Sequence, residues 1–292
     1  MNPETTLQGK PAKSAPRHGA LASPNPPPGA AEDWTVPQRW EEFTAGDHWV
    51  WDKLFARQQA LLHGRAVRAF EEGLEILHLS RPGVPNFDEL NEKLGARTGW
   101  TVVAVPGLVP DDVFFRHLSE RRFPAGNFIR AADQLDYLEE PDVFHDVFGH
   151  VPLLSHPAVA DFMEALGHLG LQALDKGALH RLARLYWYTV EFGLAREEGA
   201  LKIYGAGILS SFSESHYALE SPKPHRLGFD LERVMRTRYR TDILQQSYFV
   251  IDRFESLLKL VERTDLAGLW EMLDRMPDLS PAEAEPAERL AA

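Results

Sequence analysis

The chain has 292 residues, of which 44% are hydrophobic and 25% charged, and its formal net charge at pH 7 is −12. This composition is typical of a globular protein, and the length is enough for one sizeable core. No basic patch with interleaved aromatic residues appears, so we expect no nucleic-acid partner.

The chain contains no cysteine, which excludes disulfides, thiolate metal sites and a cysteine nucleophile. Any bound metal therefore needs nitrogen and oxygen ligands. No stretch of the sequence is apolar for long enough to span a membrane, and the N-terminus lacks the apolar segment of a secretory signal. We therefore expect a cytoplasmic protein without membrane contact.

Residues 1–33 are rich in Pro, Ala, Gly and Lys, and this composition predicts a disordered tail. Residues 277–292 predict a second flexible tail for the same reason. The body, residues 34–276, shows mostly helical spacing of apolar residues. The predicted fold class is mainly α, an α+β domain with few short strands.

In chain order, the first predicted helices cover residues 47–62 and 65–77, and Asn86 caps the start of another, with Glu89 three residues later. A short strand at residues 100–105 and a helix at 111–120 follow. Two long helices are predicted next, at residues 157–174 and 179–196. The remaining predicted elements are a strand or loop at 201–207 and helices at 210–219, 248–263 and 266–276.

His145 and His150 stand in the run PDVFHDVFGHVPLL at residues 141–154. In a straight α-helix, a five-residue offset turns by about 140°, too far for two ligands on one face. Pro152 disfavours the α-helical conformation at the residue before it. We therefore predict that a helix beginning at Pro141 frays at residues 149–151, so that His150 swings back beside His145. Two ordinary polar residues near a helix end are the alternative.

Glu191 is a lone carboxylate on the apolar stripe of the helix predicted at residues 179–196, and Arg181, Arg184 and Arg196 lie on the opposite side. A buried carboxylate needs a salt bridge, a raised pKa or a metal, unless the position reaches solvent at the helix edge. Together with the two histidines it makes a set of two imidazoles and one carboxylate. That set is typical of non-haem Fe(II) oxygenases.

Three segments carry a resemblance: residues 141–154, 184–195 (RLYWYTVEFGLA) and 202–214 (KIYGAGILSSFSE). In order and spacing they resemble the signature segments of the pterin-dependent aromatic amino acid hydroxylases, over residues 34–274. The resemblance implies one catalytic domain at residues 34–276 with Fe(II) held by His145, His150 and Glu191. Animal members carry regulatory and tetramerisation segments for which this chain has no room, so we expect a monomer.

The same resemblance implies that L-phenylalanine, O₂ and a tetrahydropterin are the partners, and that L-tyrosine is the product. In the family, Phe114 matches the aromatic residue that stacks on the pterin, Arg130 the arginine that pairs with the substrate carboxylate, and Ser210 a partner of the first histidine. No catalytic side chain beyond the metal ligands is implied. The residues matching the tetrahydropterin side are Val109, Asp111, Phe114, Asp146, Ala183 and Tyr186. Those matching the substrate side are Arg130, Pro141, Asp142, Trp187, Phe192, Gly207, Ser210 and Glu214.

Two positions depart from the animal members. Asp146 replaces a glutamate that contacts the pterin through water, and Leu138 replaces a threonine near the substrate. Simpler interpretations also exist for single residues: Phe114, Trp187 and Phe192 as core aromatics, Arg130 in a surface ion pair, and Ser210 as a helix cap.

Other functions remain open at this point. Trp187 and Thr241 favour phenylalanine over tyrosine or tryptophan as the substrate within the family. A zinc hydrolase could use the same three ligands, and a binding protein could sense an aromatic amino acid without any open metal site. A requirement for tetrahydropterin separates these alternatives.

Overall fold

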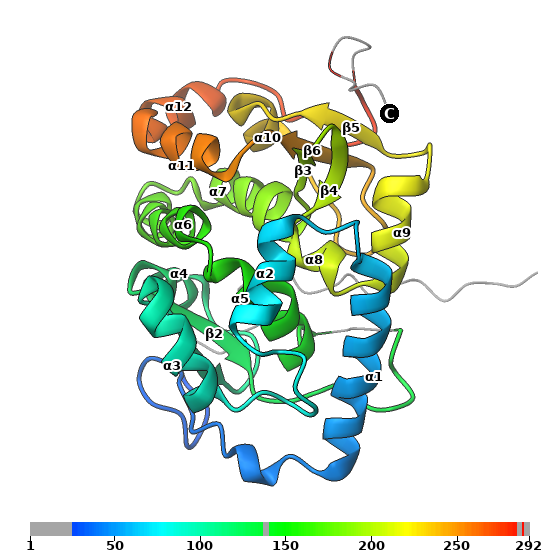
Figure 1. The fold of residues 1–292 in the computed structure, drawn as a ribbon. Coiled ribbons are helices and arrows are strands. Elements are labelled where there is room, and N and C mark those ends of the chain that lie inside the picture. The colour runs from blue at the N-terminus through cyan, green and yellow to red at the C-terminus, as the bar shows by residue number, and fades with distance from the viewer. Residues whose placement is uncertain (1–24, 137–139, 285–287, 289–292) are drawn as a thin grey trace, which may run out of the picture.

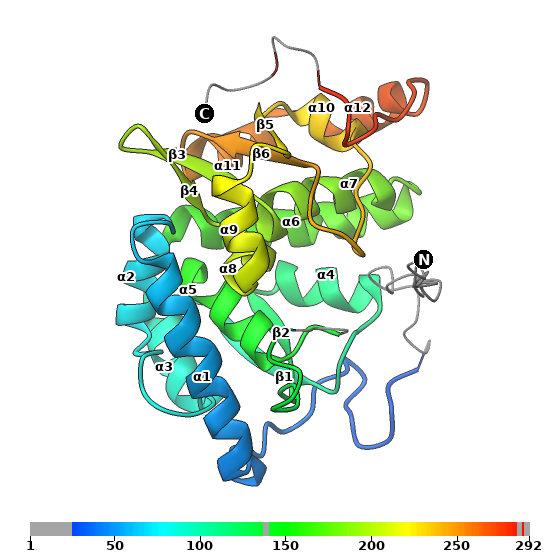
Figure 2. The ribbon, with the colours of Figure 1, turned by 90° about the vertical axis from the view of Figure 1, so that its right-hand side faces the viewer.

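The computed structural model describes residues 25–136, 140–284 and 288. Within these residues the chain is mainly helical with short strands, as predicted. The strands form two small sheets. Figure 1 shows the helices as the bulk of the molecule. Figure 2 shows α6 (Pro157–Asp175) and α7 (Leu179–Tyr186) crossing the middle, with one sheet above them and the other below.

The described chain begins with a short 3₁₀ turn and three helices: η1 (Trp40–Glu42), α1 (Ala45–Leu62), α2 (Arg68–Ile76) and α3 (Phe87–Thr98). Asn86 caps α3 through the backbone N–H groups of the next turn, as predicted. The predicted helix at residues 65–77 starts three residues late. Its first residues instead bond to the end of strand β4 (Ala200–Ile203). Val67 donates to the Ile203 carbonyl and Ile203 to the Arg65 carbonyl, both over 2.9 Å.

The smaller sheet consists of β1 (Thr101–Val105) and β2 (Arg122–Gly126), which pair in parallel across the helix α4 (Asp111–Ser119). The prediction of β1 is confirmed, whereas β2 was not predicted. Pro124 lies within β2, and a proline is tolerated there because each strand of a two-stranded sheet has a free edge.

The central segment contains two π-helical turns, η2 (Phe144–His150) and η3 (Trp187–Glu191). The turn η2 continues directly into α5 (Val151–Leu154), so the predicted fraying at residues 149–151 is wrong. Pro152 is the second residue of α5 and is accommodated within this continuous helical segment. The predicted helix to residue 196 is also too long, because α7 ends at Tyr186 and Leu194 already belongs to a strand.

The larger sheet has the order β4-β3-β6-β5. Strand β6 is parallel to both β3 and β5, and β3 is antiparallel to β4. The elements of this part of the chain are β3 (Leu194–Glu197), β4 (Ala200–Ile203), α8 (Ala206–Leu209), α9 (Phe212–Glu220), β5 (His225–Gly228), α10 (Leu231–Arg236), β6 (Ser247–Ile251), α11 (Phe254–Arg263) and α12 (Leu266–Leu273). The helix predicted at 248–263 starts only at Phe254, because Tyr248 to Ile251 are buried aromatic and branched residues that suit a strand. The helix predicted at 210–219 is α9, which starts only at Phe212, because Ser210 ends α8 and Ser211 caps the start of α9.

The aromatic core directly supports η2. Phe144 and Phe148 stack with their ring centroids 4.8 Å apart and their planes at 11°. Trp51, Phe55 and Phe70 meet these two rings edge-on. All five side chains are buried. The turn that carries both histidines is therefore fixed from behind by helices α1 and α2.

Two residues assigned to the predicted tails pack on the body. Asp33 pairs with Arg122 over 2.8 Å. Asp278 accepts hydrogen bonds from both terminal nitrogens of Arg184 over 2.7 Å and from Arg181 over 2.8 Å. This contact explains why Arg181 and Arg184 are buried rather than exposed on a polar helix face. No helix in the described part of the chain is long and apolar enough to cross a membrane.

Candidate metal centre

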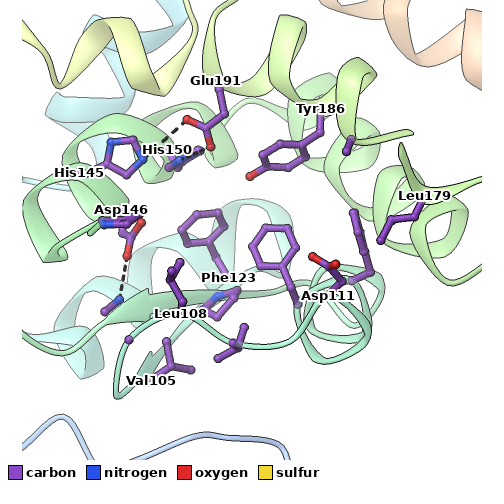
Figure 3. Close-up of a pocket in the computed structure, with 18 of the residues that line it drawn as sticks. Val105, Leu108, Asp111, Phe123, His145, Asp146, His150, Leu179, Tyr186 and Glu191 are labelled. Carbon is purple, nitrogen blue, oxygen red and sulfur yellow. Dashed lines mark hydrogen bonds and ion pairs between the residues drawn. The ribbon is translucent and has the colours of Figure 1, made fainter. Parts of the chain in front are cut away.

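The side chains of His145, His150 and Glu191 converge on one point (Figure 3). The Glu191 carboxylate lies 3.3 Å from Nε2 of His150 and 3.7 Å from Nε2 of His145. One donor atom from each residue falls within 4.8 Å of the others, and all three side chains are buried or nearly so. Among the described residues, no other group of histidine, aspartate or glutamate side chains converges in this way.

The π-helical turn accounts for the spacing of the two histidines. Its hydrogen bonds join residues five apart, so those residues lie one above the other on the same side. The imidazole centroids of His145 and His150 are 5.2 Å apart, and the ring planes are nearly perpendicular. The histidines do converge as predicted, but the cause is the type of helix and not fraying.

Ser210 settles the tautomer of His145. Its hydroxyl lies 2.8 Å from the Ala206 carbonyl, to which it donates its only proton. The same oxygen is 2.8 Å from Nδ1 of His145, so Nδ1 must carry the proton that it donates to Ser210. Nε2 then keeps its lone pair and faces Glu191. Burial lowers the pKa of His145 to about 4, opposed by the charge of Glu191, so the imidazole is neutral as a ligand must be.

The donor set fits a divalent metal such as Fe(II). Two imidazole nitrogens and one carboxylate would hold such an ion with three ligands and a net ligand charge of −1, which would leave other coordination positions for further ligands. The Glu191 carboxylate is buried, and a buried carboxylate is stabilised by a positive charge close to it. A metal ion bound between the three side chains would supply such a charge.

A cavity of about 310 Å³ opens beside the three donors. In Figure 3 the three donors lie at one end and Asp111 and Leu179 at the other. The cavity lining includes every residue predicted for the pterin side and one predicted for the substrate side: Val109, Asp111, Phe114, Asp146, Ala183, Tyr186 and Pro141. Phe123, His180 and Tyr239 also line it, and no pattern in the sequence singles them out.

Asp146 is placed beside the metal ligands at the cavity wall. Its carboxylate accepts a hydrogen bond from the Gly126 N–H over 2.8 Å. Burial raises the pKa of Asp146 to about 7, although this hydrogen bond acts in the opposite direction. Leu138, the other departure from the animal pattern, lies outside the described residues.

Arg130 and Asp142 form a buried pair beside η2. The Asp142 carboxylate accepts from Nε and Nη2 of Arg130, both over 2.8 Å. It also accepts from the backbone N–H groups of Arg130 and His145, both over 3.0 Å. Burial alone would raise the pKa of Asp142, but Arg130 outweighs it and holds the pKa below its usual value. The interpretation of Arg130 as a surface ion pair is therefore wrong.

A second group of predicted residues forms an aromatic wall. Trp187 stacks on Tyr239 with the ring centroids 4.4 Å apart and the planes at 15°, and Phe192 lies 4.7 Å from Trp187. Gly207 must be a glycine, because a Cβ there would lie 2.7 Å from the Phe192 ring. None of Trp187, Phe192 and Gly207 lines the 310 Å³ cavity, whereas Tyr239 does.

Gln245 holds this wall in place. Its side-chain oxygen accepts from Nε1 of Trp187 over 3.0 Å, and its backbone N–H donates to Glu214 over 3.0 Å. Glu214 also accepts from the Tyr248 hydroxyl. Burial raises the pKa of Glu214, against the effect of these two hydrogen bonds. Gln245 was missed because a lone amide in a loop carries no sequence pattern.

Comparison with known proteins agrees with this geometry. Residues 35–265 match the model of the biopterin-dependent aromatic amino acid hydroxylase family. The phenylalanine-4-hydroxylase of Caulobacter vibrioides is 57% identical over 266 residues, 91% of this chain and 90% of the relative. That of Chromobacterium violaceum is 55% identical over 248 residues, 85% and 83% of the two chains.

A crystal structure of the Chromobacterium violaceum enzyme with bound iron and phenylalanine superposes with a TM-score of 0.84 at 52% identity, covering 88% of this chain and 94% of that one. A structure of the same enzyme with oxidised Fe(III) gives a TM-score of 0.85. The chain belongs to the biopterin-dependent aromatic amino acid hydroxylases.

Proposed function

We propose that this protein is a phenylalanine 4-monooxygenase, which hydroxylates L-phenylalanine to L-tyrosine with O₂, Fe(II) and a tetrahydropterin. The observation that carries the proposal is a buried site of two imidazoles and one carboxylate that opens on a mostly apolar cavity. The enzymes from Caulobacter vibrioides, Ralstonia nicotianae and Chromobacterium violaceum, which are 55 to 59% identical to this chain, support the choice of substrate.

His145, His150 and Glu191 would hold the iron. When bound, iron and reduced pterin together supply the oxygen-activating chemistry. The protein would contribute the neutral imidazole of His145, whose tautomer is fixed by Ser210. It would also leave coordination positions of the metal free and exclude water through the apolar lining of the cavity. No separate general base is needed, in keeping with a cavity lined mostly by apolar side chains.

The pterin would bind in the 310 Å³ cavity. Phe114 lies in its wall and meets Phe115 and Tyr186 edge-on, with ring centroids 5.4 and 5.6 Å away. These two edge-on contacts hold the orientation of Phe114, so that it can stack on a flat heterocycle. Val109, Asp111, Ala183 and Asp146 complete this side.

The substrate would bind between Arg130 and the aromatic wall. Asp142 engages Nε and Nη2 of Arg130, and Nη1 makes one long hydrogen bond, over 3.4 Å, to the Leu135 carbonyl. The second N–H of Nη1 would then bind a carboxylate. Trp187, Phe192, Pro141 and Gly207 supply an apolar surface for a benzyl side chain. In this role Glu214 and Gln245 orient Trp187 rather than touch the substrate.

One assay tests the proposal. Protein loaded with Fe(II) is mixed with L-phenylalanine, O₂ and tetrahydrobiopterin, and tyrosine is measured. We expect tyrosine only when iron, O₂ and reduced pterin are all present, and none from zinc-loaded protein. Turnover of an ester or amide by the zinc form without O₂ or pterin would support a hydrolase instead. If tyrosine or tryptophan were hydroxylated faster than phenylalanine, that amino acid would be the preferred substrate instead.

The monomeric state and the cytoplasmic location belong to the same proposal. The mass of the protein in solution tests the first. Fractionation of the source cells tests the second.

A further inference from the structure

Trp34 adopts a backbone conformation that a bulky side chain rarely adopts. Its φ is +68°, in the left-handed region. Such a residue persists only where the surrounding structure determines its conformation. Its own turn does part of this: Trp34 donates to the Ala31 carbonyl and Ala31 to the Thr35 carbonyl, both over 2.9 Å.

Contacts with three elements fix this turn to the body. The Asp33 carboxylate pairs with Arg122 of β2 over 2.8 Å, and the Asp33 carbonyl accepts from Nε2 of His117 in α4 over 2.8 Å. Val36 donates to the Ala104 carbonyl of β1 over 2.9 Å. The turn is thus attached at both ends of the β1–α4–β2 unit, whose loop and helix form one wall of the cavity.

The Trp34 side chain lies behind that wall. It is 5% exposed and forms a small apolar cluster with Val105 and Val109, against which Val113 and Phe114 pack. This cluster is separate from the main core. Val105, Val109 and Phe114 line the cavity, whereas Trp34 does not. The indole therefore supports the cavity wall from the side away from the metal.

We propose that the Asp33–Trp34 turn is a positioning element for the pterin: it holds Val109 and Phe114 at the correct distance from the metal without touching the cofactor. This inference rests on the proposed function, since it takes the 310 Å³ cavity as the pterin site. The wall it supports consists of a loop and the first turn of α4. Loops of this kind shift more readily than residues in the main core when a support is removed.

The test compares Trp34→Ala with Trp49→Ala in the full-length, iron-loaded protein. Trp49 is 46% exposed on α1, so the same substitution there removes no support from the cavity. For Trp34→Ala we expect the KM for tetrahydrobiopterin to rise about tenfold or more and tyrosine formed per pterin oxidised to fall, because small displacements of a reactant reduce rates strongly. The KM for phenylalanine and the iron content should change less than about twofold.

Calorimetric titration of the iron-loaded protein with 7,8-dihydrobiopterin gives a readout that does not depend on turnover. Weaker binding to Trp34→Ala than to both the wild type and Trp49→Ala supports the proposal. Unchanged pterin affinity and KM, even with a lower melting temperature, would overturn it. Failure of the wild type itself to bind the pterin would refute the proposed function instead.

If Trp34→Ala does not fold, Trp34→Phe and Asp33→Asn replace it. Trp34→Phe keeps an aromatic ring but shortens it, and Asp33→Asn keeps the shape of the side chain but removes its charge from Arg122. Both substitutions should weaken pterin binding, but by less than we expect for Trp34→Ala. Wild-type pterin affinity in both would contradict the proposal.

Discussion

The Ser210 hydroxyl determines which nitrogen of His145 carries the proton. Because Ser210 donates to the Ala206 carbonyl over 2.8 Å, it can only accept from His145, and Nε2 is left as the metal-binding atom. A side chain that does not touch the metal thus fixes the orientation and the tautomer of one ligand.

Ser210→Ala should therefore weaken metal binding while the protein stays folded. Loss of such a partner typically lowers metal affinity about 10- to 100-fold. Competition between the protein and a chelator for Fe(II) measures the change. The matched control is Ser211→Ala, whose hydroxyl caps α9 by accepting from the Glu214 N–H over 3.3 Å. Equal iron affinity in the two variants would show that Ser210 has no effect on the ligand.

Arg130→Lys should raise the KM for phenylalanine and leave the iron content unchanged. The planar guanidinium of Arg130 can bind Asp142 and the substrate carboxylate at the same time, whereas lysine offers a single point charge. The loss of one charged hydrogen bond costs about 1.5–3 kcal/mol of binding free energy. Steady-state kinetics and metal analysis on one preparation check both points. The control is Arg65→Lys, because Arg65 pairs with Glu220 at the surface. An unchanged KM would remove Arg130 from the substrate site.

Phe114→Ala should raise the KM for tetrahydropterin and reduce the coupling of pterin oxidation to tyrosine formation. An aromatic stack contributes about 0.5–1.5 kcal/mol beyond burial. The contrast is Phe87 of α3, which is 4% exposed, belongs to the main core and does not line the cavity. Phe87→Ala should lower stability, by about 3–5 kcal/mol, without a selective effect on the pterin. If Phe114→Ala shows the same stability loss with normal pterin kinetics, Phe114 is a core residue.

Asp278→Asn should lower stability in a pH-dependent way. The hydrogen bond from Arg184, opposed by burial and aided by the charges of Arg184 and Arg181, lowers the pKa of Asp278 to about 2. A carboxyl whose folded pKa is depressed stabilises the fold above its usual pKa of 3.8, and this contribution is lost as the pH falls toward 2.

Urea unfolding of the metal-free protein at a series of pH values measures this effect. The stability difference between wild type and Asp278→Asn should be constant above about pH 5 and narrow as the pH falls from about 4 to about 2. Asp274→Asn is the control, since Asp274 is largely exposed and lies 3.6 Å from Arg181. A difference that does not vary with pH would mean that the carboxylate charge is unimportant.

Deletion of residues 1–24 should leave the melting temperature unchanged, whereas deletion of residues 1–33 should lower it. The first removes none of the contacts described above. The second removes the pairing of Asp33 with Arg122 and His117. The composition of residues 1–33 alone predicts no cost for either deletion. Equal melting temperatures for the two truncated proteins would show that the Asp33 contacts add nothing to stability.

The sequence identified residues whose chemistry is unusual for their position, but it did not identify elements whose conformation depends on packing. Glu191 could be found because a carboxylate on an apolar stripe needs an explanation. The π-helical turns could not be found, since their hydrogen-bond pattern has no distinct sequence period. Strand β6 resembles a helix segment because all of its residues are buried, which removes the alternation that marks most strands.

Contacts between residues far apart in the sequence could not be predicted either. Asp278 lies in a segment whose composition indicates a flexible tail, yet it pairs with two arginines almost 100 residues earlier. Tyr239 and Gln245 gain their roles from Trp187, which is about 50 residues away in the chain. Such pairs can be recognised only after the fold has brought them together.

The two π-helical turns connect iron to the folding equilibrium. A π-turn is a rare conformation that forms where surrounding contacts favour it, and both turns here end at a residue of the metal-binding set, His150 and Glu191. An unfolded chain has no preformed site, so the metal binds the native state in preference and stabilises it by mass action. The fraction of chains that are folded, and hence protected from proteolysis, should therefore rise with the supply of iron in the cell. Scarcity of the metal would then reduce the amount of this enzyme as well as its turnover.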